Sequence, residues 1–323
     1  VRPWGLQYAA TAGGTAEADT AAVVGLPGGR AYSSLWMSVA VGVSVHSLTA
    51  YPVTTFGTPE QQSTLLPDML SDEQLGAYCL SEQQAGSDIG SMTTRATTDD
   101  ASGEYVLRGR KAWISHAGHA DYYTTFVRTS DDGGKGLSCF IVPGDATGLS
   151  FGAPERKMGL HCDTVREVMY DDVRVDGARR IGAEGQGMAI ALSALDAGRL
   201  GIAAAATGLA QSALDLAASY AKERQQFGRA IGANQGLAFL IADMEAAVTS
   251  ARATYLHAAR LKDAGRSFSK EAAVAKLTAT DAAMRVTTDA VQVLGGRRIT
   301  KKKTAERFIP AAKAPHIFEG TNH

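Results

Sequence analysis

Apolar residues recur along the chain with spacings that change twice, and each spacing predicts a different kind of element. From about Tyr32 to Leu75, Ala, Ser, Leu and Val recur at roughly the period of a helix. Thr58 and Pro59 indicate a helix start, because Thr is a favoured N-cap and Pro is tolerated in the first helical turn. We therefore expect helices in this zone, one of them beginning at Pro59. The preceding stretch, Gly13 to Gly29, is loose and rich in Gly and Ala.

The second zone, from about Gly76 to Val175, consists of short runs rich in β-branched and aromatic residues, separated by Gly, Asp and Pro. Such runs are typical of strands joined by turns. They are Tyr105–Leu107, Ala112–Ile114, Tyr122–Val127, Ser138–Val142 and Val168–Tyr170. This pattern predicts a compact antiparallel β domain, either a barrel or a sandwich.

The third zone, from about Gly187 to Gly295, returns to a helical period. Its long, Ala-rich and amphipathic stretches are Arg199–Arg224, Asn234–Ala264 and Ser269–Leu294. Long helices joined by short turns indicate an antiparallel bundle.

Charge and hydropathy exclude several classes of partner. The 323 residues include 32 Lys and Arg against 33 Asp and Glu, so we expect neither a nucleic-acid nor a membrane partner. The most apolar stretch, Met188–Ala218, carries Asp196, Arg199 and Asp215 and lacks the ~20 uninterrupted apolar residues of a membrane span. The chain starts without a signal-peptide run, and we expect a cytoplasmic location in a bacterium or the mitochondrial matrix in a eukaryote.

Cysteine usage and the absence of common motifs narrow the chemistry. Cys79, Cys139 and Cys162 form no CxxC pair, so we expect buried free thiols in a reducing compartment. The sequence contains no HExxH, GxGxxG or GxxxxGK[ST] motif. We therefore expect no metal site and no Rossmann or P-loop nucleotide site.

Two segments of the β zone are candidates for ligand binding. Leu80–Asp88 is polar and contains a Gly-Ser-Asp turn, so it could cradle an anionic or heteroaromatic ligand, or be an ordinary β turn. Lys111–Ser115 places Trp113 beside a polar backbone run. A Trp in a strand is more often part of the core than the wall of a cofactor site.

Three further segments, in the third zone and after it, are also candidates. Arg224–Gly228 ends a helix, where the Arg either stabilises the helix dipole or grips a phosphate. Gln292–Gly296 has the pattern of a helix C-cap. Ile317–Thr321 contains Glu319 between an aromatic residue and a glycine. An apolar pocket would make that carboxylate basic, whereas a solvated loop glutamate is the simpler reading of this segment alone.

Together these segments resemble the acyl-CoA dehydrogenase family over about Tyr32 to Thr321. The family patterns are L-[ST]-E-x-x-A-G-S-D, K-x-W-I-[ST], R-x-x-F-G followed by a Gln, Q-x-x-G-G and [YF]-E-G-T. They are matched in that order by Leu80–Asp88, Lys111–Ser115, Arg224–Gly228 with Gln235, Gln292–Gly296 and Phe318–Thr321. Five motifs in the right order and spacing are a far more specific signal than any one of them.

The resemblance implies an α+β fold that is mostly α. It consists of an N-terminal helical domain (1–76), a central antiparallel β domain (77–176) and a C-terminal four-helix bundle (177–323). Compared with the family, we expect the N-terminal domain to be shortened and the last helix of the bundle to be missing.

The resemblance also implies FAD-dependent α,β-dehydrogenation of an acyl-CoA to a trans-2-enoyl-CoA. Glu319 would abstract the α-proton, and the β-hydrogen would leave as hydride to flavin N5. Some members carry the base on a bundle helix instead, where this chain has Gly198, so the assignment goes to Glu319. The segment from Asp196 to Arg199 resembles short-chain and branched short-chain members.

The residues carried over from the family fall into three groups. The implied isoalloxazine contacts are Tyr78, Leu80, Ser81, Gly86, Ser87, Trp113, Ile114 and Ser115, with Thr321 and Asn322 reaching the flavin again. The implied contacts from a neighbouring subunit are Arg224, Phe227, Gln235, Gln292, Val293, Gly295 and Gly296. The implied acyl-CoA contacts are Ser87, Asp196, Arg199 and Gly320. A shared site implies at least a homodimer, with a homotetramer as the usual family state, and electron-transfer flavoprotein as the electron acceptor.

The chain departs from the family at Arg297–Thr304, at Pro310-Ala311 and at His323. The basic residues of the first segment are expected to form a solvated loop rather than a phosphate or partner patch. Two rival functions stay open at this stage. One is an acyl-CoA oxidase, in which O₂ reoxidises the flavin, and the other is a non-catalytic acyl-CoA-binding or assembly member.

Overall fold

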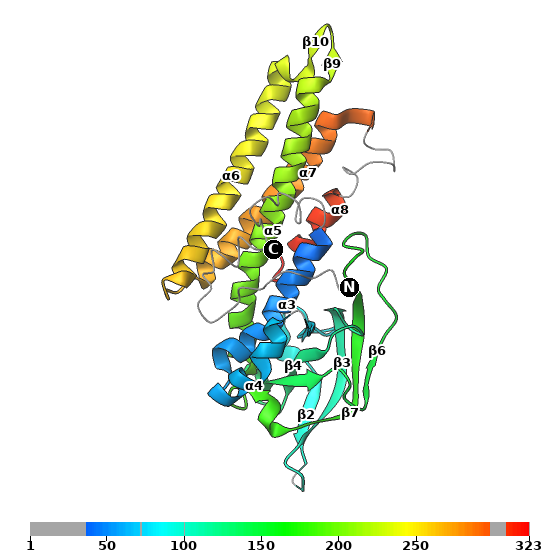
Figure 1. The fold of residues 1–323 in the computed structure, drawn as a ribbon, viewed down its shortest axis with the longest axis vertical. Helices are drawn as coiled ribbons and strands as arrows, with labels where there is room; N and C mark the ends of the chain where they lie inside the picture. Colours follow the sequence, from blue (N-terminus) through cyan, green and yellow to red (C-terminus); the bar gives the residue numbers. More distant parts are fainter. Residues whose placement is uncertain (1–36, 72, 100, 298–307, 323) are drawn as a thin grey trace. The chain divides into compact units, whose positions relative to one another are not determined.

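The computed structural model describes residues 37–71, 73–99, 101–297 and 308–322 (Figure 1). Its contacts divide the chain into two compact units, which are described separately. The first contains Gly42–Arg156 and Asp163–Gly198, and the second contains Lys157–Cys162 and the chain from Arg199 onward. The loose segment 13–29 and the basic residues 301–303 lie outside the described residues. The predicted division into three domains stays a prediction.

Two helices precede the sheet, α3 (Met37–Phe56) and α4 (Pro59–Leu70). Helix α4 begins as predicted, because Thr58 caps it. The Thr58 side chain accepts a hydrogen bond from the Gln61 backbone N at 3.1 Å, and the Gln61 side chain accepts one from the Thr58 N at 2.9 Å. This reciprocal capping box satisfies two backbone donors that the first helical turn leaves without intrahelical partners.

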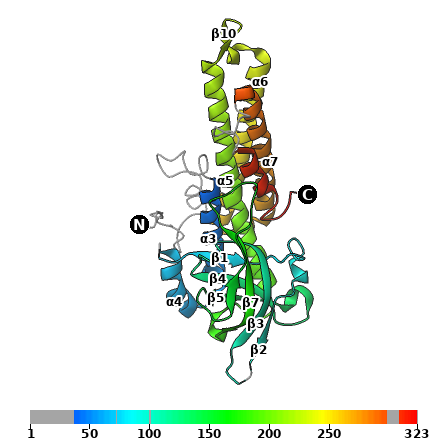
Figure 2. The same ribbon diagram turned by 90° about the vertical axis from the view of Figure 1, so that its right-hand side faces the viewer.

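The described part of the first unit contains an eight-stranded sheet, in the order β6-β7-β3-β2-β4-β5-β8 with β1 beside β4 (Figures 1 and 2). The strands are β1 (Gly76–Cys79), β2 (Arg95–Thr98), β3 (Tyr105–Ser115), β4 (Tyr122–Arg128), β5 (Leu137–Pro143), β6 (Leu149–Phe151), β7 (Val165–Val175) and β8 (Arg180–Ile181). Most pairings are antiparallel, as predicted. The exceptions are β1 with β4 and the single pairing of Arg95 with Arg128, which are parallel.

Two of the predicted strands are one strand in the structure. The runs Tyr105–Leu107 and Ala112–Ile114 both belong to β3, whose register against β7 shifts on both sides of Lys111. Such irregularities re-aim side chains within a strand. Strand β1 was missed because Gly and Ala are weak strand formers, yet it is buried throughout.

The sheet is buried on both faces where β4 and β5 lie. Tyr122 and Phe126 of β4 pack into a cluster with residues of α3, α4 and the start of α5 (Gly187–Glu223). Tyr123 and Val127 point to the other face and pack into a second cluster with residues of β3 and β7. This alternation is the two-residue period of a strand, and it gives β4 apolar contacts on both sides.

The second unit is helical. Besides the rest of α5, it contains the hairpin β9 (Gln225–Gln226) and β10 (Arg229–Ala230), α6 (Gln235–Asp263), α7 (Ser269–Leu294) and α8 (Phe308–Lys313) (Figure 1). The 3-10 turns of the first unit are η1 (Ile89–Ser91), η2 (Gly133–Gly136) and η3 (Gly177–Arg179), and those of the second are η4 (Ile231–Ala233), η5 (Gly295–Arg297) and η7 (Ala314–His316). Of the expected four-helix bundle, the described residues provide three long helices, α5, α6 and α7, and the short helix α8.

The predicted fold class, mostly helical with a central sheet, is confirmed.

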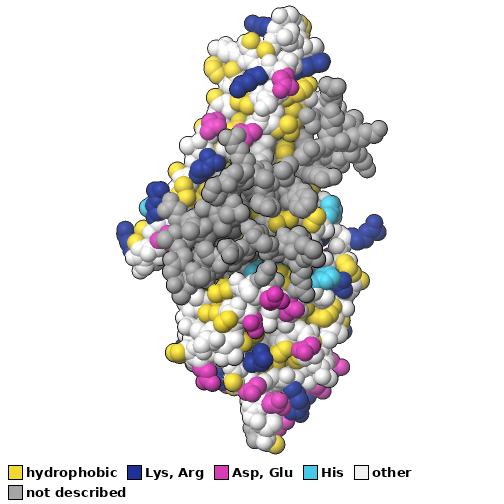
Figure 3. Space-filling view, in the orientation of Figure 1, with side chains coloured by type: hydrophobic (Ala, Val, Ile, Leu, Met, Phe, Trp, Pro, Cys, Tyr) yellow, Lys and Arg dark blue, Asp and Glu magenta, His cyan; other side chains and the backbone are white. Residues whose placement is uncertain are grey.

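Helix α5 begins at Gly187 rather than at the predicted Arg199, because burial of its first turns outweighs two glycines that weaken the helical signal. By length and composition α5 is apolar enough to cross a membrane. Half of its most apolar stretch is buried inside the protein. Acidic and basic side chains are intermixed on the face seen in Figure 3, in keeping with the net charge of −1.

Gly76 of β1 provides a test of this packing. A Cβ at this position would lie 2.1 Å from the Thr49 Oγ1 and 2.5 Å from the Tyr122 Cζ. Gly76→Ala should therefore lower the free energy of unfolding by about 1–3 kcal/mol, measured by urea denaturation. Gly90→Ala is the control, because its Cβ would make only ordinary contacts at 3.4 and 3.6 Å. Equal stability of the two variants would contradict the packing described.

Candidate active site

The segment after α8 and η7 forms a tight turn that carries Glu319. The Ile317 N donates to the Ala314 O at 2.9 Å, and the Asn322 N donates to the His316 O at 3.1 Å, so the turn is closed on itself. Glu319 has φ +56° and Gly320 has φ +92°. A left-handed conformation is unfavourable for a residue other than glycine, and such residues concentrate at functional sites.

The Glu319 carboxyl is shielded from water within this turn. Its Oε2 atom is buried and has no hydrogen-bond partner among the described residues. Burial raises the pKa of the carboxyl to about 7, against the opposing effect of the Arg199 and Lys276 cations. The reading of Glu319 as a solvated loop residue is therefore wrong.

Two cations from neighbouring helices hold the turn. The Arg199 Nε on α5 donates to the Glu319 backbone O at 3.1 Å. The Lys276 Nζ on α7 donates to the Gly320 backbone O and, at 2.8 Å, to the Asn322 Oδ1. Lys276 is a buried residue. Burial, followed by repulsion from Arg199, lowers its pKa to about 8, while Glu319 and Asp281 act in the opposite direction.

Asn322 links the same turn to α7. Its Nδ2 donates to the Thr280 Oγ1 and to the Asp281 Oδ1, both at 2.8 Å, while its Oδ1 accepts from Lys276. The whole side-chain amide is thus used within the chain. The predicted flavin contact at Asn322 would have to use its backbone, whereas Thr321 beside it is exposed.

Sequence reasoning missed Lys276, although it left a signal. Lys276 lies on α7 among the buried residues Ala272, Ala275, Ala279 and Thr280. A lysine within an apolar helical stripe is seldom buried unless it has a partner. The predicted substrate contacts Arg199 and Gly320 are part of this site. Asp196 is half-buried one turn earlier on α5.

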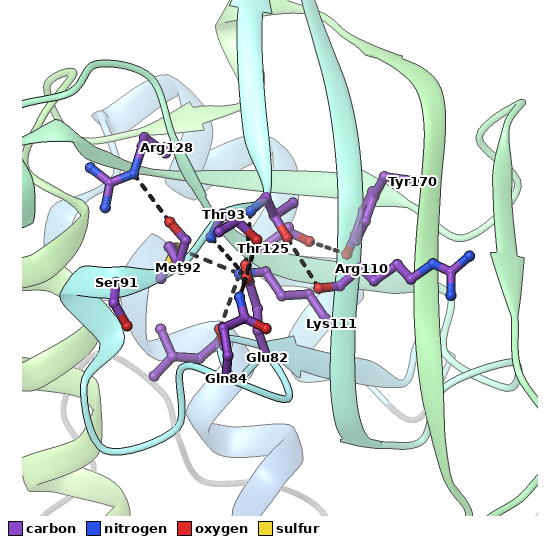
Figure 4. A network of polar contacts seen from close by, with 12 residues as sticks. Glu82, Gln84, Ser91, Met92, Thr93, Arg110, Lys111, Thr125, Arg128 and Tyr170 are labelled. Atoms are coloured by element: carbon purple, nitrogen blue, oxygen red, sulfur yellow. Dashed lines mark hydrogen bonds and ion pairs between the residues drawn. The ribbon is translucent and has the colours of Figure 1, made fainter.

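In the first unit, a buried ion pair joins the two predicted ligand segments (Figure 4). The Lys111 Nζ donates to the Glu82 Oε1 at 2.9 Å and to the Leu80 O at 3.0 Å. Glu82 also accepts from the backbone N atoms of Thr93 at 2.8 Å and Thr94 at 3.0 Å. Burial by itself would raise the pKa of Glu82, but Lys111 and these donors hold it at about 2.

The ion pair fixes the backbone that the predicted flavin contacts occupy. The Ala112 N donates to the Ser81 O at 2.9 Å, which ties the Leu80–Asp88 loop to β3. Gly86 and Ser87 are exposed in this loop, and a Cβ on Gly86 would meet no atom within 4 Å. The loop therefore offers open, polar backbone beside a rigid strand.

Trp113 is not a core residue, contrary to the simpler reading of its segment. It has φ +58°, and 55% of it is exposed although its neighbours Ala112 and Ile114 are buried. The Ser115 Oγ donates to the Asp163 Oδ2 at 2.7 Å. Among the predicted flavin contacts, Tyr78, Leu80 and Ile114 are buried in this chain, so their side chains pack within the protein.

The remaining predicted cofactor residues lie on the second unit, at the β9–β10 hairpin and the end of α7. Phe227 of the hairpin is 96% exposed with φ +53°. Gly295 caps α7 with φ +62°, as its C-cap pattern predicted. Most of this group is exposed, namely Arg224, Phe227, Gln235, Gln292, Gly295 and Gly296, whereas Val293 is buried.

Comparisons with known proteins agree with the motifs. Models of the acyl-CoA dehydrogenase N-terminal, middle and C-terminal domains match residues 7–73, 77–173 and 185–323. The chain is 44% identical over 290 residues to an acyl-CoA dehydrogenase of Bacillus subtilis (strain 168), covering 88% of this chain and 76% of that protein. It is 42% identical over 282 residues to a short-chain specific acyl-CoA dehydrogenase of Clostridium acetobutylicum, covering 87% and 74%.

The fold is also similar to a solved structure. Butyryl-CoA dehydrogenase from Megasphaera elsdenii superposes with a TM-score of 0.92 at 37% identity. The match covers 96% of this chain and 80% of that one.

The ion pair in the first unit leads to a stability prediction. Lys111→Met should lower the free energy of unfolding by about 3–5 kcal/mol, because it leaves the Glu82 carboxylate buried without its cation. Adding Glu82→Leu should restore part of the loss. Lys135→Met, at an exposed position of the same unit, should change stability by less than about 0.5 kcal/mol. A double variant less stable than Lys111→Met would contradict this account.

Proposed function

This chain belongs to the acyl-CoA dehydrogenase family, and on that premise we propose that it removes the α and β hydrogens of a short acyl-CoA thioester. The product would be a trans-2-enoyl-CoA. The observation that carries the proposal is the Glu319 carboxyl, buried in a left-handed turn with Oε2 unpartnered among the described residues. Glu319 would be the base that takes the α-proton.

The environment of Glu319 suits that role. A thioester α-proton is only weakly acidic, so its base must be aligned and shielded from water. A carboxyl with a pKa of about 7 is a stronger base than an ordinary glutamate and is still largely ionised just above neutrality. The turn aims this carboxyl through fixed backbone contacts with Arg199 and Lys276.

The charge that develops on the thioester oxygen also needs a donor. By resemblance to the family, we expect the Glu319 backbone N–H to donate to that oxygen, which is stabilisation of the oxyanion-hole type. The Arg199 side chain lies close to Gly320, because a Cβ at position 320 would be 3.2 Å from the Arg199 Nη2. The absence of a side chain at position 320 keeps this space open.

The residue types present fit FAD. Trp113 offers an exposed aromatic surface in the first unit, and Gly86 leaves open space at a polar backbone loop. We propose that Tyr78 to Ser87 and Trp113 to Ser115 hold the isoalloxazine ring. When bound, FAD accepts the β-hydrogen as hydride. The protein's own contribution is to bind and orient it.

We further propose that a second copy of the chain completes the cofactor site. Phe227, almost fully exposed, is an unusual solvent-facing aromatic, and Arg224, Gln235 and Gln292 are exposed polar groups suited to phosphates and an adenosine. A homodimer is then the minimum unit, and a homotetramer is the expected assembly. Electron-transfer flavoprotein is the proposed electron acceptor.

We also propose a short acyl chain for the substrate and a reducing compartment for the protein. The segment from Asp196 to Arg199 and the similarity to a short-chain specific enzyme support a short acyl chain. The three free cysteines, two of them buried, support a reducing compartment such as the cytoplasm or the mitochondrial matrix.

Glu319→Gln tests the proposed base. The variant should bind FAD and acyl-CoA, but flavin reduction by substrate should slow by about 10³-fold or more, because the amide cannot accept the proton. Anaerobic stopped-flow bleaching of the flavin with butyryl-CoA measures the rate. Glu60→Gln, an exposed glutamate on α4, is the matched control.

Bleaching of Glu319→Gln at a near wild-type rate would place the base elsewhere. The same experiment addresses the rival functions. Rapid reoxidation and peroxide release when air is admitted would identify an oxidase. A wild-type protein that binds no flavin would identify a non-catalytic member.

A further inference from the structure

Lys276 takes up no hydrogen in the proposed reaction, yet it is among the most deeply buried charges described in the second unit. Three per cent of the residue is exposed. Placing an ammonium in such a site is costly unless hydrogen bonds and opposite charge compensate it. The hydrogen bonds of the Lys276 side chain lead to the turn that carries Glu319. Its Nζ donates to the Gly320 O and to the Asn322 Oδ1.

These two hydrogen bonds fix the part of the turn that follows Glu319 in the sequence. Gly320 and Asn322 follow the base in the sequence, while the Arg199 Nε holds the Glu319 carbonyl itself. Asn322 is in turn bonded to Thr280, one helical turn after Lys276 on α7. The left-handed Glu319 backbone is therefore held from two helices, which is how a strained conformation persists.

The charges around Lys276 also link it to Glu319. The charged or titratable groups placed around Lys276 are Glu319 on the turn, Arg199 on α5, Asp281 on α7 and His316 on η7. Glu319 attracts the ammonium, and in return Lys276 favours the ionised form of Glu319. Asp281 lies between the Asn322 Nδ2 at 2.8 Å and the His316 Nε2 at 3.6 Å, so part of its charge is already engaged.

We propose that Lys276 is a positioning residue for the reaction: its ammonium holds the 320–322 turn and thereby the Glu319 backbone, and it places a positive charge beside the base. The inference rests on the proposed function of Glu319. It assigns two separable tasks to one side chain, a donor task and a charge task. A lysine that only filled a gap in the bundle would perform neither.

Three substitutions separate the tasks. Lys276→Gln keeps a hydrogen-bond donor but removes the charge, Lys276→Met removes both, and Lys276→Arg keeps both. Lys270→Met, at an exposed position of the same helix, is the matched control. Each variant is purified with FAD, and the rate of anaerobic flavin reduction by butyryl-CoA is measured from pH 5.5 to about 9.

Removing a nearby positive charge disfavours the carboxylate, so the acid limb of the profile should move to higher pH. We expect a shift of about one pH unit in Lys276→Gln and Lys276→Met. Lys276→Arg and Lys270→Met should keep the wild-type limb. At the pH plateau, Lys276→Met should reduce flavin at least about tenfold more slowly, and Lys276→Gln should lose less.

A second readout needs no cofactor or substrate. Hydrogen–deuterium exchange of the peptide spanning residues 314–322 reports whether the turn is held. In Lys276→Met apoprotein these amides should exchange about tenfold faster than in wild type, because the Asn322 N–H bond to His316 opens more often. Lys276→Gln should stay close to wild type and serves as the test of charge if Lys276→Met does not fold.

The outcomes distinguish this inference from the proposed function. If no acyl-CoA reduces the wild-type flavin, the proposed function fails, and the exchange experiment still tests the hold on the turn. If wild type is reduced normally while Lys276→Gln and Lys276→Met keep its acid limb and its exchange rates, the positioning role of Lys276 is overturned. A shifted limb together with faster exchange supports it.

Discussion

The Glu319 carboxyl is buried beside Arg199 and Lys276, and the surrounding turn and helices must compensate for the cost of that burial. Taking a carboxylate out of water raises its basicity, but an isolated buried charge is too costly to keep. Two cations offset that cost without bonding to the Oε2 atom, which stays buried and unpartnered among the described residues. The Arg199 Nε donates to the Glu319 backbone O, and the Lys276 Nζ donates to the Gly320 O and the Asn322 Oδ1. In the proposed reaction, this arrangement holds the base in place while its Oε2 atom is left for a proton.

The first unit also contains a buried carboxylate, but there the pKa is lowered and not raised. Glu82 is also a buried carboxylate, yet its oxygens accept from Lys111 and from the backbone of Thr93 and Thr94. These donors lower the pKa of Glu82 to about 2, so it is a permanent anion and not a base. Its role is structural, because the pair joins the Leu80–Asp88 loop to the strand that presents Trp113 (Figure 4).

Much of the architecture could be predicted from the sequence. The boundaries of α7, the start of α4 and four of the eight strands of the sheet, β3, β4, β5 and β7, follow from periodicity and capping residues, and the family follows from five short motifs. Strand β1 was not predicted, because its burial depends on packing against Tyr122 and Thr49 and not on its own residues. The exposure of Trp113 was missed for a similar reason. A left-handed backbone turns its side chain outward, and the residue type does not encode that.

The site could be predicted less completely than the fold. Glu319 was found through its motif, but the motif gave no account of why the carboxyl is dry. The turn that carries it is also bonded to Lys276, which lies 43 residues before Glu319 in the chain. Only the folded chain brings the two together. Contacts between residues so far apart leave little local signal, apart from the single charge in the buried stripe of α7.

The central claim is that Glu319 is held as a dry carboxyl with raised basicity. It is tested most directly by titrating that carboxyl, using infrared difference spectra between wild type and Glu319→Gln across pH 4 to 9. The account predicts that the protonated carboxyl band disappears with a midpoint near pH 7. A midpoint near 4.5, the value of an ordinary glutamate, would contradict it.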